Sequence, residues 1–296
     1  MKMRFQKIII ALIIFLPVLI GIFFASSSPE RSGLPGTHFR KLAVVKVNGL
    51  IAESNHTVAQ LKSYRQDRNI AGVLLRIESQ GGGVAPSQEI YNEVNLYREQ
   101  SKPLVVSMGN LAASGGYYIA APAQRIFALP GTVTGSIGVT FSSPLVRELT
   151  EKIGIEFRTF KAGSYKDIAS PHREMTDQER DIINDLLKDT HEQFIDDIAN
   201  ARGLDRKKVE QFSDGRIFTG RQALQYGLID YLGGFEDAID YLLTSTGLPQ
   251  NARIVEQDKS RSFFSSLLSD ITKDLFPYLS SLFKPAGVYY LFSPGM

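Results

Sequence analysis

The chain has 296 residues, of which 43% are hydrophobic and 22% are charged, and its formal net charge is +2 at pH 7. These values are ordinary for a folded globular protein, and the nearly balanced charge argues against a nucleic-acid partner. Because there is no cysteine, disulfides, thiolate nucleophiles and thiolate metal ligands are excluded. The four histidines are scattered without zinc-site spacing, so we expect neither a metal nor another cofactor.

The N-terminus has the pattern of a membrane segment. Lys2, Arg4 and Lys7 precede residues 8–25, which carry no charged or polar side chain. As a helix this run would span about 27 Å, close to the thickness of a bilayer's hydrocarbon core. We therefore expect residues 1–25 to form a cytoplasmic basic tip and an inner-membrane anchor, with the rest of the chain on the periplasmic side. A cleaved signal peptide is the alternative, since small residues follow the run. Residues 26–40 are rich in Pro, Gly and Ser, as in a linker.

The next part of the chain alternates between strand and helix patterns. Short apolar or β-branched runs predict strands, and apolar residues at helical spacing predict the helices between them. The expected strands are residues 42–47, 70–77, 104–108, 125–129 and 136–140, and the expected helices are residues 57–68, 86–99 and a segment after Ser114. This alternation predicts an α/β core with parallel strands.

Ser114 stands where the strand at 104–108 gives way to a helix, and two glycines follow it. A hydroxyl there lies beside helix N-terminal N–H groups, which stabilise developing negative charge. This is typical of an activated serine, although small residues at this place also permit tight helix packing. A second glycine turn, Gly81–Gly83, would meet it at the same sheet edge. A nucleotide site is the alternative there, but the GxGxxG and P-loop spacings are absent.

The second half of the sequence is helical. Thr176 to Glu179 forms a capping box, and the helix it begins ends before Gly203; we interpret its apolar stripe as core packing. Further helices are expected at residues 205–212, 221–226 and 235–244. Residues 258–296 form an amphipathic, aromatic tail, predicted as a helical extension that docks on the protein core, on another subunit or on the membrane. We favour docking on protein.

A nucleophilic serine needs a base, and the sequence offers two candidates. His172 has no acidic residue placed to orient it. Lys166 is favoured, because burial favours the neutral amine that a base requires. An ordinary solvated lysine paired with Asp167 is the alternative.

Several motifs in fixed order resemble one family, the short-form signal peptide peptidases, which are serine–lysine proteases with a Clp protease/crotonase-type core of repeated β-β-α units. The matching segments are Ser79-x-Gly81-Gly82-Gly83, Ala113-Ser114-Gly115-Gly116-Tyr117-Tyr118, Thr134-Gly135-Ser136-Ile137-Gly138-Val139, Gly163-x-x-Lys166-Asp167, Ser170-Pro171-x-Arg173-x-Met175-Thr176 and Gly215-Arg216-x-x-Thr219-Gly220-x-x-Ala223. On this resemblance residues 41–257 are the peptidase domain.

The resemblance also implies roles for individual residues. Ser114 would be the nucleophile and Lys166 the general base, while Ser136 would hydrogen-bond the lysine amine. The backbone N–H groups of Gly82 and Gly115 would form the oxyanion hole. In similar enzymes the serine and the lysine of one site come from neighbouring subunits of a dome-like homo-oligomeric ring.

The implied substrates are remnant signal peptides and other hydrophobic peptides, cleaved through an acyl-enzyme intermediate. A regulatory membrane protease that cuts one partner protein is an alternative, and an acyl-CoA enzyme fits poorly with an exported domain. One departure favours a third reading, a non-catalytic scaffold. The family usually has Asn-Ser-Pro-Gly-Gly where this chain has Glu78-Ser79-Gln80-Gly81-Gly82. Losing the proline frees an N–H and predicts a looser oxyanion turn.

Overall fold

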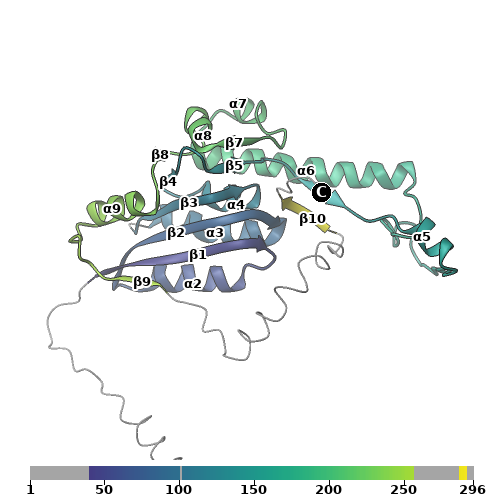
Figure 1. Ribbon diagram of the computed structural model, residues 1–296, viewed down its shortest axis with the longest axis horizontal. Helices are drawn as coiled ribbons and strands as arrows, with labels where there is room; N and C mark the ends of the chain where they lie inside the picture. Colours follow the sequence, from purple (N-terminus) through teal and green to yellow (C-terminus); the bar gives the residue numbers. More distant parts are fainter. Residues whose placement is uncertain (1–39, 101, 257–286, 292–296) are drawn as a thin grey trace, which may run out of the picture. The chain divides into compact units, whose positions relative to one another are not determined.

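A mixed ten-stranded β-sheet organises the part of the chain that the structure describes (Figure 1). The structure is a computed structural model, and it describes residues 40–100, 102–256 and 287–291. The expected anchor and linker, and most of the expected tail, lie outside these residues. None of the helices in the described ranges is long and apolar enough to cross a membrane.

The long strands are β1 (Lys41–Ile51), β2 (Ile70–Gly83) and β3 (Leu104–Ala113); the shorter strands are β4 (Arg125–Ala128), β5 (Val133–Gly135), β6 (Thr140–Ser142), β7 (Ile217–Thr219), β8 (Tyr231–Leu232), β9 (Ile254–Glu256) and β10 (Gly287–Leu291). The helices are α2 (Asn55–Gln66), α3 (Val84–Glu99), α4 (Gly115–Ala120), α5 (Arg147–Lys152), α6 (Asp177–Arg202), α7 (Arg206–Glu210), α8 (Gly220–Tyr226) and α9 (Phe235–Thr246).

Parallel pairing runs through the centre of the sheet, from β9 to β1, β2, β3, β4 and β8. Helices connect the long strands, so the predicted α/β core is confirmed. Each long strand also changes register or partner along its length. The β2–β3 pairing shifts between Ile77 and Ser79, and the second half of β3 leaves β4 and pairs with β5. The second half of β3 runs directly into Ser114.

Side chains on the two faces of the sheet enter two separate cores. On one face Val45, Leu75 and Val106 pack with α2, α3, α4 and α6. On the other face Leu74 and Val105 pack beneath α9 (Figure 1). Because alternate residues of a strand point to opposite faces, burial of both faces requires the nearly continuous apolar runs seen in the sequence.

Some predicted boundaries are wrong at the irregular parts of the sheet. The predicted turn Gly81–Gly83 is the extended end of β2, because β10 pairs with it. The predicted strand at 136–140 is absent, and β5 and β6 flank this segment instead. Gly135 and Ser136 both have positive φ, at 79° and 51°, which interrupts extended backbone.

The capping box of α6 is confirmed, and the helix ends at Gly203 in the left-handed conformation, with φ of 63°. Its apolar stripe is only partly core. Phe194 and Ile198 are fully buried, whereas Ile182 and Leu186 near the start of the helix are 40% and 44% exposed. The core interpretation is therefore right for the second half of α6 and wrong for the first half, whose apolar side chains face solvent in a single chain.

The described part of the C-terminal tail lies beyond Pro277, the residue at which the apolar helical stripe of the tail should end. Gly287–Leu291 is a strand, β10, which pairs antiparallel with β2 and with β6. Its Tyr290 is fully buried within the larger core. This segment docks on the protein core, as favoured, but it does so through main-chain pairing.

Candidate active site

Ser114 lies at the sharp turn between β3 and α4, where the sequence predicted it. Its φ of 54° and ψ of −119° are outside the common regions for a residue with a side chain. Two backbone hydrogen bonds hold this conformation: the Ser114 N–H donates to the Gly135 carbonyl at 2.7 Å, and the Tyr118 N–H donates to the Ser114 carbonyl at 2.8 Å. Strained backbone of this kind concentrates at functional sites.

The Ser114 hydroxyl has no structural task. The residue is 1% exposed, and its Oγ has no hydrogen-bond partner among the described residues. Although Ser114 is the N-cap residue of α4, its side chain makes no capping hydrogen bond. A buried hydroxyl without a partner is costly, so its retention indicates a group that binds a partner from outside the described residues.

Three glycines bring two backbone segments together beside Ser114. A Cβ on Gly115 would lie 3.2 Å from the Gly82 nitrogen and 3.2 Å from the Gly81 Cα. A Cβ on Gly81, where φ is 100°, would lie 2.7 Å from the Gly115 nitrogen. Only glycine permits this approach. Since Gly115 is the first residue of α4, its N–H has no acceptor within the helix. The structure thus places the Gly82 and Gly115 amides next to each other.

The part of β2 before these glycines is held without the proline usual in the resembled family. The Ser79 hydroxyl donates to the Gly49 carbonyl at 2.6 Å and accepts from the Gly81 N–H at 3.0 Å. The neighbouring Glu78 carboxylate accepts from the N–H groups of Asn110 and Leu111 at 2.9 and 3.0 Å. Ser79 therefore holds the end of β2 against β1, and Glu78 holds it against β3. Sequence reasoning missed this role of Glu78.

Ser136 lies one residue from the backbone group that holds Ser114. Its N–H donates to the Arg216 carbonyl at 2.8 Å, and the residue is 7% exposed. No side-chain hydrogen bond of Ser136 occurs within the described ranges. The structure therefore brings the backbone positions of Ser114, Ser136, Gly82 and Gly115 together.

Lys166 is not part of this group in a single chain. It lies in the exposed segment between β6 and α6, which we call the arm (residues 143–175). Within the described chain its amine makes no hydrogen bond or ion pair. The proposed pairing with Asp167 is also absent: that carboxylate binds Lys161 at 2.5 Å and Arg173 at 2.8 Å. Lys166 is therefore presented to solvent with its amine free.

Arg173 joins the Lys166 turn to the start of α6. Its guanidinium donates to Asp167 at 2.9 Å and to both oxygens of Glu179 at 2.8 and 2.5 Å. These hydrogen bonds lower the pKa of Glu179 to about 2, and those from Arg173 and Lys161 hold the pKa of Asp167 well below its usual range. Arg173 thus holds the turn that carries the exposed Lys166 against the start of α6.

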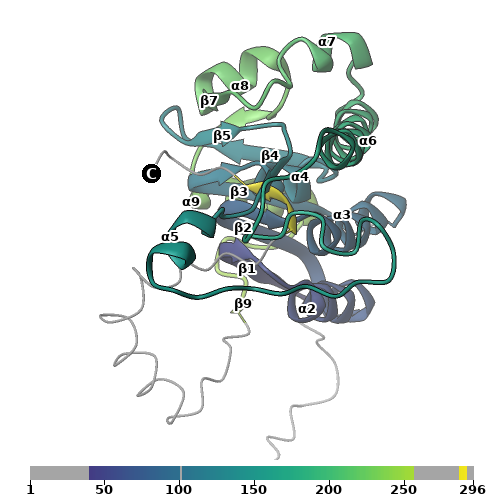
Figure 2. The same cartoon turned by 90° about the vertical axis from the view of Figure 1, so that its right-hand side faces the viewer.

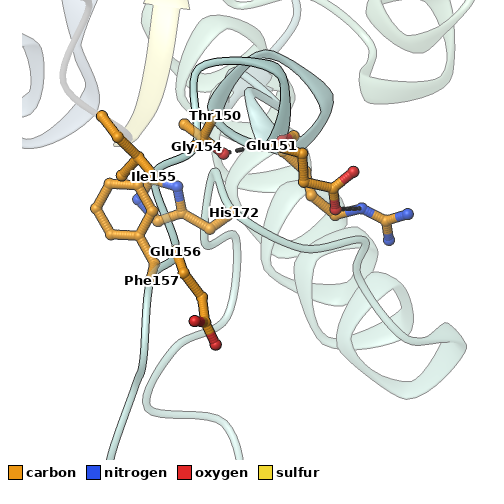
Figure 3. Close-up of a pocket in the computed structure, with 8 residues that line it drawn as sticks. Thr150, Glu151, Gly154, Ile155, Glu156, Phe157 and His172 are labelled. Carbon is orange, nitrogen blue, oxygen red and sulfur yellow. Dashed lines mark hydrogen bonds and ion pairs between the residues drawn. The ribbon is translucent and has the colours of Figure 1, made fainter.

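The other base candidate, His172, lies elsewhere on the arm, in a pocket lined in part by Ile155, Glu156 and Phe157 (Figure 3). Its ring stacks on Phe157, with centroids 3.5 Å apart and an interplanar angle of 14°. Nδ1 is buried without a partner among the residues described, so no carboxylate orients the imidazole as a base requires.

No group of three or more His, Asp or Glu side chains in the described ranges is arranged to hold a metal ion.

A second feature that sequence reasoning missed is β10, which lies against Gly81–Gly83. The signal available was the aromatic run near the C-terminus, but nothing local indicated the strand with which it would pair.

An α/β sheet carries a strained serine at a strand–helix turn, flanked by two glycine backbones, and the serine hydroxyl has no hydrogen-bond partner among the described residues. This is the arrangement of a serine hydrolase. Comparison with known proteins agrees: residues 97–248 match Peptidase family S49, and residues 43–134 match the Clp protease family. The chain belongs to Peptidase family S49 and is a serine peptidase.

The relatives cover most of the described chain. A protein of Synechocystis sp. named as a protease is 43% identical over 211 residues, covering 71% of this chain and 76% of the relative. A protein of Enterococcus faecium named as signal peptide peptidase SppA is 35% identical over 263 residues, covering 84% and 76%. Protease 4 of Salmonella typhi is 32% identical over 207 residues, covering 67% of this chain and 33% of the relative. A solved ClpP1 mutant of Listeria monocytogenes is 18% identical with a TM-score of 0.45, covering 66% of this chain and 94% of that one.

Proposed function

We propose that the protein is a membrane-anchored serine endopeptidase with a Ser114–Lys166 dyad, which degrades remnant signal peptides and other hydrophobic peptides. The observation that carries this proposal is the buried, unpartnered Ser114 Oγ beside the Gly82 and Gly115 amides, in a chain of Peptidase family S49. A hydroxyl in this position needs only a base to attack a bound carbonyl carbon.

The base is Lys166 of a neighbouring copy of the chain. Two observations support this assignment: the Ser114 hydroxyl has no partner within the described chain, and Lys166 is exposed on the arm. The arm and the first half of α6 also expose large apolar side chains, which are Leu145, Leu149, Ile153, Ile155, Phe157, Phe160, Ile182 and Leu186. Apolar surface of this extent is typical of a subunit interface. Docking against a second copy would bury it and desolvate the lysine amine.

The chemistry follows from these positions. The neutral amine of Lys166, oriented by the Ser136 hydroxyl, takes the Ser114 proton while Oγ forms a bond to the substrate carbonyl carbon. The Gly82 and Gly115 amides stabilise the resulting oxyanion, each donor lowering the barrier by about 3 kcal/mol. The lysine ammonium then protonates the leaving amine as the peptide bond breaks. Water, deprotonated by the same lysine, hydrolyses the acyl-serine and regenerates the hydroxyl.

The substrate class and the location rest on other evidence. The Enterococcus faecium relative is named a signal peptide peptidase. The basic, then apolar, N-terminal sequence supports an inner-membrane anchor with the peptidase domain on the periplasmic side. Cleaved signal peptides remain in that membrane, and their apolar segments are the peptides that an anchored enzyme would meet.

Cleavage of a fluorogenic hydrophobic peptide by the full-length protein tests the dyad. Ser114→Ala and Lys166→Ala should each abolish cleavage, while Lys207→Ala, an exposed lysine on α7, should leave it unchanged. Unchanged cleavage by Ser114→Ala would refute the nucleophile assignment. Preference for one membrane protein over hydrophobic peptides in general would instead favour the regulatory protease.

The non-catalytic scaffold is favoured only by Gln80 in place of the usual proline. In the absence of that proline, the hydrogen bonds of Ser79 to Gly49 and Gly81 hold this part of β2. Labelling with a serine-reactive fluorophosphonate distinguishes the two functions. A catalytic serine is labelled in the unmodified protein and not in Ser114→Ala, whereas a scaffold is labelled in neither.

A further inference from the structure

Strand β3 carries two extra residues opposite Glu78. Ile77 of β2 lies opposite Met108, but Ser79, two residues further along, lies opposite Ala112. Glu78 alone therefore faces residues 109–111, which we call the β3 bulge. In Figures 1 and 2 β3 lies between β2 on one side and β4 and β5 on the other. The bulge is also where β3 leaves β4 and begins to pair with β5.

The β3 bulge decides where the serine lies along β2. If the register of the first half of β3 continued, Ser114 would lie level with Gly83, whereas the shifted register places it level with Gly81. The difference is two residues, or about 7 Å along a strand. At the level of Gly81, a Cβ on Gly115 would lie 3.2 Å from the nitrogen of Gly82, so the serine turn meets a proposed oxyanion donor. Bulges beside active sites re-aim side chains in this way.

The Glu78 carboxylate supplies acceptors for two amides of the β3 bulge. The N–H groups of Asn110 and Leu111 donate to its two oxygens, one to each, at 2.9 and 3.0 Å. Hydrogen bonds from a backbone N–H to an ionised carboxylate are about twice as strong as those between neutral groups. Gly109 leaves room for this contact, because a Cβ there would lie 1.7 Å from the Glu78 Oε2. The bulge is therefore built around the carboxylate.

Other side chains bind the carbonyl groups at the start of the bulge. The Arg76 guanidinium donates to the Met108 carbonyl at 3.0 Å, and the buried Thr132 hydroxyl donates to the Gly109 carbonyl at 2.8 Å. Backbone polar groups that lose their strand partners need such substitutes. Of these side chains, Glu78 binds the part of the bulge that is nearest the serine in the sequence.

We propose that Glu78 is a positioning residue of the peptidase reaction: its carboxylate fixes the β3 bulge and thereby sets Ser114 beside the oxyanion amides. The inference rests on the proposed peptidase function and adds to it a residue that acts through Ser114 and not on the substrate. The competing explanation is that Glu78 only stabilises the sheet. The two explanations differ in whether loss of the carboxylate lowers turnover or only the melting temperature.

The kinetics of full-length Glu78→Gln test the proposal with a fluorogenic hydrophobic peptide. This change keeps the size of the side chain but replaces one acceptor oxygen by an NH2 group, which cannot accept from a backbone amide. The value of kcat should fall about 10- to 100-fold, because a displacement of about 1 Å at a reacting group costs up to about 100-fold. KM should stay within about twofold, as expected when only the reacting geometry is lost. An unchanged kcat would overturn the proposal, whatever the melting temperature.

Asp230→Asn is the matched control. The Asp230 carboxylate also accepts from a backbone amide of the sheet, that of Ile126 in β4 at 2.8 Å, and it binds Arg202 at 3.0 Å. Its loss should lower the melting temperature at least as much as Glu78→Gln does, while kcat stays unchanged in an assay well below that temperature. An equal loss of kcat in both variants would indicate general loosening of the sheet and would overturn the positioning role.

A second variant reaches the carboxylate from the other strand. Gly109→Ala places a Cβ in the space of the Glu78 Oε2 and should displace the carboxylate, so kcat should fall as it does in Glu78→Gln. The two effects should not add, because both changes break the same contact. In a Glu78→Ala protein, Gly109→Ala should therefore have little further effect. A further fall as large as that in the unmodified protein would overturn the proposal.

Hydrogen exchange separates failure of this inference from failure of the proposed function. The amides of residues 110–114 should exchange faster in Glu78→Gln than in the unmodified protein, and unchanged exchange would overturn the positioning role without any measurement of activity. Cleavage that persists in Ser114→Ala would instead refute the proposed nucleophile, while the exchange result on Glu78 would still stand.

Discussion

Division of the dyad between two copies of the chain can be tested by mixing two inactive variants. Ser114→Ala removes the nucleophile and Lys166→Ala removes the base, so each alone should lose about 10³-fold or more in kcat. The structure gives the reason to expect rescue on mixing. Within the described chain the Ser114 Oγ has no partner and the Lys166 amine faces solvent, which fits a dyad formed between copies. A mixed assembly can then join the intact serine of a Lys166→Ala copy to the intact lysine of a Ser114→Ala copy.

The expected size of the rescue follows from the geometry of a closed ring. In the proposed arrangement, each site takes its serine from one copy and its lysine from the neighbour on one side. In a random equal mixture, the serine-bearing copy and the lysine-bearing neighbour are each intact about half the time, so about one quarter of the sites are complete. If both groups came from one chain, no site in the mixture would be complete.

The assay is the hydrolysis rate of a fluorogenic hydrophobic peptide, measured after the two variants are co-expressed and native mass spectrometry has shown mixed assemblies. A control mixes the unmodified protein with the Ser114→Ala/Lys166→Ala double variant. A dyad between copies again gives about one quarter of full activity, whereas a dyad within one chain gives about one half. Mixed assemblies of the two single variants that stay inactive would refute the shared site.

Three further outcomes are expected. Arg173→Ala should lower kcat without changing the melting temperature of the sheet, because it releases the Lys166 turn from Glu179. Hydrogen exchange at residues 163–173 should therefore become faster in this variant, and unchanged exchange would contradict the reasoning. Stability of the arm should fall with acid: the pKa values of Asp167 and Glu179 are lowered on folding, so their contribution is complete above about pH 4.5 and is lost as pH falls towards 2. Limited proteolysis of the arm across that pH range should show this loss of stability. In Arg173→Ala the rate of proteolysis should depend less on pH. The Phe160 side chain is 94% exposed in the single chain. Phe160→Ser should therefore shift the native mass towards smaller species, while the melting temperature of the single chain stays the same as in the unmodified protein. An unchanged native mass would argue against the arm as the interface.

Features set by local rules were predictable from the sequence. The α6 boundaries follow from the Thr176 capping box and from Gly203, which ends the helix in the left-handed conformation. The placement of Ser114 followed from a short apolar strand and the small residues after it. In each case the physical cause lies within a few residues of the feature.

Features set by distant partners were not predictable in this way. The glycines at 81–83 are extended because β10, about two hundred residues later in the sequence, pairs with them. The apolar stripe of α6 has the same kind of side chains in its exposed half and in its buried half, since an interface and a core need the same side chains. Glu78 reads as a departure from a family motif, and only the folded chain shows its carboxylate binding the Asn110 and Leu111 amides.

The energetics of Ser114 connect the fold to the proposed dependence of activity on assembly. Its backbone conformation costs about 1–3 kcal/mol, and burying its hydroxyl without a partner costs a similar amount. Both costs fall on one residue, and neighbouring groups hold it there: the Gly135 carbonyl accepts its N–H, and Gly82 and Gly115 occupy the space beside it. A second copy that brought an amine to Oγ would remove the hydroxyl's part of this cost. The same contact that completes the dyad would then also stabilise the assembly, so an isolated chain would carry a formed but inactive site.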